Sequence, residues 1–431
     1  MKKIKSSLLF ICLLISSCSQ NAINWLTAEK SLSPSSINNF NSKNQNICSE
    51  NNLRILISLD DTKNNFEKLL TNTSFYYYSN IEKALALALV ELIRRPDLNS
   101  PQANFQFYFG DHKNINYYHF TNKKSDGLPV IYGIDFLLKK YSKNKNILTI
   151  AQELDKALPT NFFVDRELEN FIQKNKKIII SSPMLSNIFL RGDEPLTRFE
   201  TFKRSSLTDL VKYYLKNNQL NSSDYYNFKL NIFDYEENFG NVVTKCNFNP
   251  VSEQEPINID LATNDRINYV GMANKQEVYF ATFFSIQNEQ IELINNQLFF
   301  KANSPKIELP VCQIYNPTNE LNMILSSTEG RSKNQHLKHL IEYEVYNSID
   351  DKQLFDILNF PRHLFLSNPD RILYESKKGR ENQLNFFLSM NFPIYHVEKL
   401  GNIIGFTKFK NRPEYNFIQD LRNNNKTLCT K

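Results

Sequence analysis

The chain has 431 residues, of which 41% are hydrophobic, 13% aromatic and 22% charged. This length corresponds to two or three domains, and the apolar content excludes a wholly disordered protein. Only 10 residues are glycine, which argues against collagen-like chains, glycine-rich repeats and most phosphate-binding loops. The formal net charge is +6.

The first residues predict an export signal. Three lysines among the first five residues precede an apolar run, Leu8–Ile15. The run is too short for a membrane-spanning helix, which needs about 20 apolar residues, so it predicts a secretion signal. Ile15-Ser16-Ser17-Cys18 resembles the bacterial lipobox. The resemblance implies that residues 1–17 are removed and that Cys18 carries the lipid; the alternative is an ordinary signal peptide with an incidental cysteine.

The predicted lipid sets the expected location. Two or more acyl chains, at about 0.8 kcal/mol per buried CH₂, hold a protein stably on a membrane. Residue 19 is Ser rather than Asp, which favours the outer membrane if the cell has two. Loss of residues 1–17 removes three lysines and no acid, so the charge falls from +6 to +3. We therefore expect a lipid-anchored envelope protein and no nucleic-acid partner.

Residues 18–50 are rich in Ser and Asn and predict a flexible tether. From there to residue 245, predicted strands and helices alternate. The expected strands are 53–59, 104–109, 176–181 and 228–235, and the expected helices are 81–95, 130–143, 147–158, 165–174 and 206–218. This alternation predicts an α/β domain at 51–245 with a doubly wound, mainly parallel sheet.

The second half has a different pattern. Apolar strand-like runs follow one another from residue 257 to 327, and helical patterns occur at 335–348, 351–358 and 380–390. We therefore expect a β-rich α+β domain at 246–431.

Polar residues follow three of the elements predicted for the first domain. The first strand ends in Asp-Asp-Thr-Lys-Asn (60–64), KSDGLP (124–129) leads into the next helix, and the apolar run 176–181 is followed by Ser-Pro. In this order they resemble the von Willebrand factor A domain, which has Asp-x-Ser-x-Ser after its first strand, a Gly-Gly-Thr loop before a helix and Thr-Asp-Gly after a later strand. The resemblance covers about residues 52–240 and implies an A-type fold.

The A-domain resemblance also implies a metal site. In that family Mg²⁺ or Mn²⁺ is held by a carboxylate and hydroxyls, with one position open for a partner's acidic side chain. The matching ligand positions here are Asp60, Thr62 and Asn64, and the implied partner contacts are Asp61, Ser125, Asp126 and Gly127. Leu128 replaces the family's Thr and Ser182 its second carboxylate, so the site is degenerate. The alternative is an A-like scaffold without metal.

Four cysteines remain after the signal, namely Cys48, Cys246, Cys312 and Cys429. In an oxidising compartment they can form disulfides, with three possible pairings. Because the ends of an A-type domain lie close together, the resemblance implies a Cys48–Cys246 bridge. Cys312–Cys429 would then fasten the tail; four free thiols are the alternative.

The sequence thus favours a non-enzymatic protein-binding role at the cell envelope, in adhesion or envelope assembly. One alternative is a hydrolase or transferase that uses the 326–339 region, where Ser326 and Ser327 precede His336 and His339. The other alternative is a solute-binding lipoprotein.

Overall fold

The chain is described by a computed structural model. It covers residues 54–58, 69, 72–111, 115–122, 127–216, 225–230, 235–248, 265–287, 293–294, 297–303, 309–329, 333–366, 370–375, 381–389, 391–397, 400–410, 412, 414–418, 420, 422 and 425–429.

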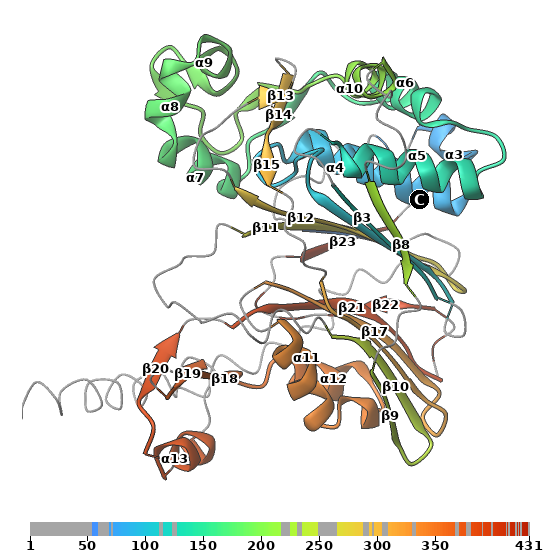
Figure 1. The fold of residues 1–431 in the computed structure, drawn as a ribbon, viewed down its shortest axis with the longest axis vertical. Coiled ribbons are helices and arrows are strands. Elements are labelled where there is room, and N and C mark those ends of the chain that lie inside the picture. Colours follow the sequence, from blue (N-terminus) through green and yellow to red (C-terminus); the bar gives the residue numbers. More distant parts are fainter. Residues whose placement is uncertain are drawn as a thin grey trace, which may run out of the picture.

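Two sheets lie face to face between two layers of helices (Figure 1). The upper sheet has the order β23-β1-β11-β12-β2-β3-β8, with β15 paired to β12. Its strands are β1 (Arg54–Ser58), β2 (Asn104–Gly110), β3 (Ile115–Asn122), β8 (Tyr225–Leu230), β11 (Asp265–Ala273), β12 (Val278–Gln287), β15 (Ala302–Asn303) and β23 (Asn425–Cys429). Every pairing between them is antiparallel.

The lower sheet is antiparallel as well, with the order β22-β21-β17-β16-β10-β9. Its strands are β9 (Tyr235–Phe239), β10 (Val242–Asn247), β16 (Val311–Asn316), β17 (Leu321–Glu329), β21 (Asn402–Lys408) and β22 (Asn416–Phe417).

The helix α4 (Asn80–Arg94) lies at the centre of the upper helix layer. Its Ala/Leu-rich sequence is buried on nearly all sides, because it packs between the sheet strands β11 and β12 and the outer helix α6 (Ile147–Ala157). Ser79 and Glu82 form a capping box at its start. α5 (Pro129–Tyr141) covers β2 and β3, and α10 (Leu207–Lys216) packs on α6. The short α3 (Thr73–Tyr76) precedes α4.

A further group of short elements extends the upper layer at the left of Figure 1. It contains three helices and small two-stranded sheets: α7 (Arg166–Lys174), α8 (Lys176–Ser181), α9 (Pro183–Phe189), β4 (Asn161–Phe163) with β7 (Thr201–Lys203), β5 (Leu190–Arg191) with β6 (Glu194–Pro195), and β13 (Leu293–Ile294) with β14 (Gln297–Phe300).

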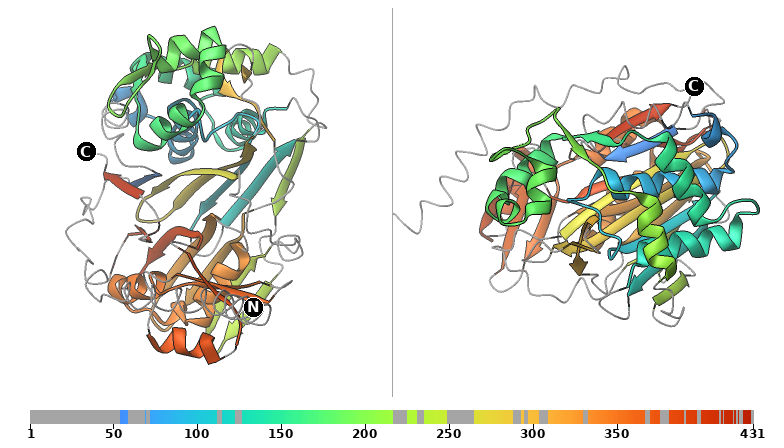
Figure 2. Two further views of the ribbon diagram at one scale, coloured as in Figure 1. Left: turned by 90° about the vertical axis from the view of Figure 1, so that its left-hand side faces the viewer. Right: turned by 90° about the horizontal axis from the view of Figure 1, so that it is seen from above.

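The lower layer contains α11 (Lys333–Glu342), the 3₁₀ turn η5 (Val345–Asn347) and α12 (Asp351–Leu358). Beside it lies a small sheet of β18 (His363–Leu366), β19 (Arg371–Glu375) and β20 (Ile394–Val397), packed on α13 (Glu381–Ser389). In the left view of Figure 2 this small sheet is at the bottom of the molecule and the α7–α9 group at the top.

The two main sheets share one apolar core. Leu56, Tyr108 and Phe280 of the upper sheet pack with Ile404 and Phe406 of the lower sheet. The other faces of the two sheets pack on their own helix layers. The molecule therefore has four layers.

The expected doubly wound parallel sheet is wrong. Both main sheets are antiparallel, and β11, β12 and β23 from the second half of the chain belong to the upper sheet. The boundary placed at residue 245 falls inside β10, and strands from both sides of it contribute to each sheet. The run at 176–181 forms α8 rather than a strand.

The predicted disulfide pairing also needs correction. Cys246 is bonded to Cys312, its direct neighbour across β10 and β16, so it cannot be bonded to Cys48. Cys48 and the side chain of Cys429 lie outside what the structure describes. Among the described helices, none has the length and apolarity needed to cross a bilayer.

Candidate functional site

Most of the residues expected from the A-domain resemblance cannot be placed. Asp60, Asp61, Thr62, Asn64, Ser125 and Asp126 lie outside the described residues, as does Cys18. Gly127 is buried just before α5, where its carbonyl accepts a hydrogen bond from the Asn122 amide at 3.0 Å. Ser182 caps α9 through the Leu185 N–H and follows no strand.

No metal site is evident in the part of the chain that the structure describes. Within it, no group of three or more His, Cys, Asp or Glu side chains is arranged to hold a metal ion. The Mg²⁺ or Mn²⁺ site implied by the resemblance thus has no support from described side chains.

Buried polar groups instead gather around the second half of β12. On the helix side of the upper sheet, Asn268 lies opposite Phe283 and donates to the Glu91 carboxylate at 2.9 Å. Arg94 donates to both oxygens of the same carboxylate, at 3.0 and 2.7 Å. Ser285, also buried, has a hydroxyl without a hydrogen-bond partner among the described residues. The end of α4 is thus fixed to β11 by charge-assisted hydrogen bonds.

The segment between α4 and β2 is polar yet almost wholly buried, which is unusual for a connection. Arg95 forms a bidentate pair with Asp97, at 2.8 and 2.7 Å, and reaches Asp165 at 3.4 Å. Asp165 in turn accepts from the Leu168 N–H at the start of α7. Arg95 therefore connects this segment to the α7–α9 group.

The inner face of the upper sheet is also polar at this end. Asn104 lies opposite Phe284, and Gln106 lies between Thr282 and His119 on the neighbouring strands. All of these polar side chains are buried, and Thr282 is 3.4 Å from the Gln106 side-chain oxygen. Such a row of amides and hydroxyls is costly inside a core unless its members are hydrogen-bonded.

The lower half of the molecule brings a lysine to Phe284, and two buried hydroxyls lie on the preceding strand. Lys333, at the start of α11, is 8% exposed, and its ammonium lies 5.0 Å from the ring centre of Phe284 in the upper sheet. Ser326 and Thr328, at the end of β17, are each 1% exposed. Ser326 donates to the Pro310 carbonyl at 2.9 Å.

Thr328 differs from Ser326 in its bonding. It lies in the irregularity of β17 that faces β21, where Glu329 is matched with Asn402. Neither the Thr328 hydroxyl nor the Asn402 side-chain oxygen has a hydrogen-bond partner within the described ranges. Thr328 thus offers a buried hydroxyl that no described residue engages, in the strand that leads to Lys333.

Ser327 and His336 do not form the pair expected for a hydroxyl nucleophile and its base. Both are buried, and neither the Ser327 hydroxyl nor either ring nitrogen of His336 is hydrogen-bonded to any described residue. Burial, followed by the positive charge of Arg362, holds the pKa of His336 well below its usual value. His336 is therefore neutral and a weak base.

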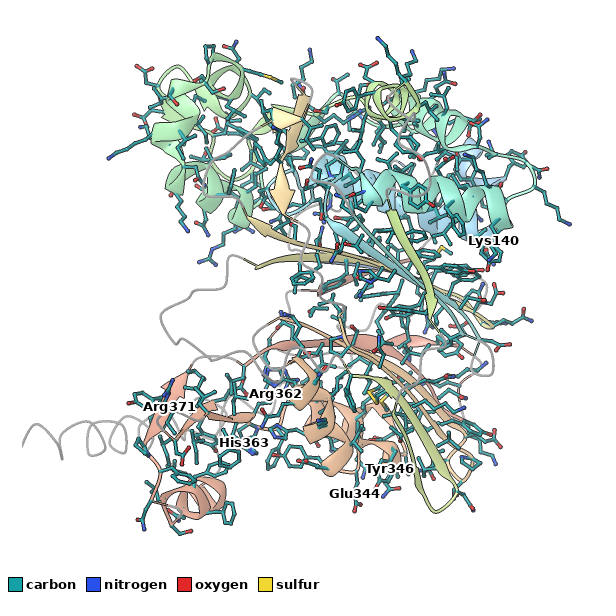
Figure 3. All side chains as sticks on the ribbon, in the orientation of Figure 1. Lys140, Glu344, Tyr346, Arg362, His363 and Arg371 are labelled. Atoms are coloured by element: carbon teal, nitrogen blue, oxygen red, sulfur yellow. A yellow bond between two sulfur atoms is a disulfide. The ribbon has the colours of Figure 1, made fainter. Side chains whose placement is uncertain are left out.

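Below His336 lies a buried ion network. Asp420 bonds Arg362 at 2.8 Å and Arg422 at 3.0 Å, and Arg422 also pairs with Glu375. Burial alone would raise the pKa of Asp420, but the two guanidinium groups outweigh it and lower that pKa. Figure 3 shows Arg362 at the junction of the lower helix layer and the small sheet. Its charges are paired with one another, although the buried Nε of Arg362 has no hydrogen-bond partner among the described residues, and the network supports the fold.

The sequence pointed to part of this region. The hydroxyls and histidines of the 326–339 segment predict a site there. The structure places Lys333 of this segment against Phe284, at the polar end of the upper sheet. Glu91, Arg94 and Asn268 were missed, because they come from two separate parts of the chain and meet only in the folded protein. Asn104, on the inner face of the sheet, was missed as well. The one available signal was the charge pair of Glu91 and Arg94 in an otherwise apolar helix.

Neither a protein-family model nor a curated protein matches this chain. Solved structures do. The structure of LmbA2991HD matches with a TM-score of 0.61 at 7% identity, over 89% of this chain and 99% of that one. Cephalosporin acylase from Bacillus halodurans matches with a TM-score of 0.57 at 8% identity, over 88% of this chain and 96% of that one.

These likenesses show the fold alone: the chain is folded like these two solved structures, and its antiparallel sheets are not those of a von Willebrand factor A domain. The expectation of a non-enzymatic adhesion module depended on the A-type fold, and it is wrong together with that fold. The similarity extends over nearly the whole chain.

Proposed function

We propose that this chain is an enzyme, a hydrolase or transferase that acts on an acyl bond, with its site at the end of the sandwich around Phe284. The fold likeness to an acylase supports the reaction class. The site is argued from two observations: the Lys333 ammonium lies 5.0 Å from the ring centre of Phe284, beside the polar inner face of the upper sheet, and the buried hydroxyl of Thr328, five residues before Lys333 in the chain, has no hydrogen-bond partner among the described residues.

The chemistry follows from these groups. A hydroxyl attacks a carbonyl carbon only when a base takes its proton, and a lysine amine can act as that base. Thr328 supplies the hydroxyl in this proposal and Lys333 the amine. Side-chain amides such as that of Asn402 would donate to the oxyanion that develops on the carbonyl oxygen.

The resulting acyl-enzyme has two fates. Attack by water releases an acid, as in a hydrolase, and attack by an amine gives a new amide, as in a transferase. Because Thr328 is 1% exposed, substrate reaches its hydroxyl only when covering side chains move.

The test uses the purified chain with an alkyne-tagged β-lactone, which acylates activated hydroxyls, and a panel of aminoacyl p-nitroanilides. We expect a label on the peptide that carries Thr328. Thr328→Val should abolish labelling and lower turnover at least about 10³-fold, the scale for loss of a nucleophile. Ser326→Ala is the matched control, because that hydroxyl is already bonded to a carbonyl; it should retain most of the labelling.

Intact-mass measurement gives the opposing outcome. In an Ntn hydrolase the nucleophile is an N-terminal residue, activated by its own amine. A purified protein that consists of two polypeptides, with the label on the new N-terminal residue and full labelling of Thr328→Val, would refute the role of Thr328. Absence of labelling and of turnover with every probe would refute the enzymatic proposal itself.

A further inference from the structure

A pair of histidines joins two parts of the lower half of the molecule. The ring of His339, in α11, stacks on the ring of His363, the first residue of β18, with centroids 4.4 Å apart. His363 also packs on Phe387 of α13 at 4.7 Å and on Phe365 at 5.3 Å. We call β18, β19, β20 and α13 the small-sheet module. The histidine pair is therefore part of the joint between this module and the lower helix layer, beside Arg362 (Figure 3).

The pair is surrounded by aromatic rings, positive groups and two acids that are paired with arginines. Arg362 precedes His363 in the chain, and His336 lies one turn before His339 in α11. The other titratable groups packed nearby are Tyr343 on α11, Tyr374 and His396 on the small sheet, and the buried Arg422, Asp420 and Glu375.

The two acids of this set are already engaged by arginines. Asp420 is bonded to Arg362 and Arg422, and Glu375 to Arg422 and to backbone N–H groups. Within the described residues no carboxylate is hydrogen-bonded to His339 or His363, and the Nδ1 atoms of both rings are buried without a partner. A proton added to either ring would find no compensating charge.

We propose that the His339–His363 pair is an acid-sensitive joint, which holds the small-sheet module on α11 at neutral pH and releases it as the pH falls. Protonation places two positive charges on rings 4.4 Å apart, next to Arg362. Release moves both rings into water, where the charged forms are solvated and can separate.

The pKa values support this direction. Burial, and then the charges of His363 and Arg362, lowers the pKa of His339 to about 3, and burial lowers the pKa of His363 to about 4. In water a histidine has a pKa of about 6.5. The closed module is therefore neutral at these rings between about pH 4 and 6.5, where the open module binds protons.

This difference sets the size of the effect. Each histidine that takes up a proton on opening increases the opening constant about tenfold per pH unit below pH 6.5. Two histidines give about a hundredfold per unit, until the closed state itself becomes protonated near pH 4. His336 remains under the lower sheet whether the module is closed or open, so it adds nothing to the pH dependence of the opening constant.

The test is hydrogen exchange of the full chain, read by mass spectrometry between pH 7 and pH 4 and corrected for intrinsic rates. Amides of β18 and β19 should lose protection as the pH falls from 6.5, by about a hundredfold per unit in the wild type. His363→Phe, which keeps an aromatic ring, should reduce this to about tenfold per unit. His339→Phe with His363→Phe should remove the dependence. His396→Phe, in the same sheet but outside the pair, is the control and should behave as wild type.

Three outcomes overturn the joint. One is equal protection of β18 and β19 at pH 7 and pH 4. Another is loss of protection in β12 together with β18, which would mean that the whole chain unfolds in acid. The third comes from NMR of the folded wild type and does not depend on any variant's stability: an imidazole of the pair that titrates near pH 6.5 would show that protonation is not resisted in the closed state.

Discussion

Arg422 bonds to two acids and two carbonyls at once. It pairs with Asp420 and Glu375, and it donates to the carbonyls of Leu358 and Phe360 at 2.9 Å. Burial would lower its pKa, but the two carboxylates outweigh burial and raise it. One residue thus connects α12, β19 and the segment after β22, and the three are separated by many residues in the chain.

Removal of one partner from this network should be costly. We expect Asp420→Asn to destabilise the chain by about 3–5 kcal/mol, because two buried guanidinium groups lose their shared charge. Urea unfolding followed by circular dichroism measures this. The control is Glu320→Gln, which breaks an ion pair of 68% and 53% exposed side chains with Lys410 and should change stability by less than about 1 kcal/mol. Equal effects of the two variants would contradict the assigned role of the network.

At the scale of elements, the long apolar segments were predictable and the pairings were not. The helices at 81–95, 130–143 and 147–158 correspond to α4, α5 and α6, because their apolar periodicity is strong. The run 176–181 is too short for periodicity to separate strand from helix, and its three isoleucines favoured a strand. β3, with its Tyr and His residues, carries no continuous apolar run and was missed.

The candidate site was predictable only where it is local. Ser326, Ser327 and His336 lie within eleven residues and could be found from spacing. Asn268 and Glu91 are 177 residues apart and meet because β11 lies under α4. This contact cannot be predicted from local sequence patterns, because it depends on how β11 pairs with β1 and β12. The A-domain interpretation was wrong for the same reason: order along the chain was taken for order in the sheet.

The β10–β16 disulfide is the element-scale prediction. Cys246 and Cys312 are opposite each other on adjacent strands and 66 residues apart. Closing a loop of that length restricts the unfolded chain, so Cys246→Ser with Cys312→Ser should cost about 2–4 kcal/mol in urea unfolding. Non-reducing peptide mapping of the wild type should yield one peptide pair that contains both cysteines. A Cys48–Cys246 pair in that map would refute the pairing.

At the scale of the whole molecule, the two sheets cannot be divided where the sequence texture changes. β1 and β2 come from the first half of the chain, but β11 and β12 lie between them in the upper sheet. The lower sheet is equally mixed, because β9 and β10 pair with each other and β10 pairs with β16 from the second half. Arg54 of β1 also links the two sheets directly, because it forms an ion pair with Glu414 and donates a hydrogen bond to the Asn416 side chain.

This interleaving predicts how fragments and the full chain behave. A fragment of residues 51–245 leaves β1 without β11 and β2 without β12, and it exposes the apolar face of α4 that covers them. We expect it to lack the near-ultraviolet circular dichroism and the hydrogen-exchange protection of the full chain, because unpaired strands and an uncovered helix do not offset the entropy of ordering. Mixing it with residues 246–431 should restore both signals, since every strand of both sheets is then present and only β10 is divided. The full chain, with one core shared between its sheets, should unfold in urea in a single transition followed equally by far- and near-ultraviolet signals. A 51–245 fragment that is protected on its own, or two separate transitions in the full chain, would show that the halves are independent domains after all.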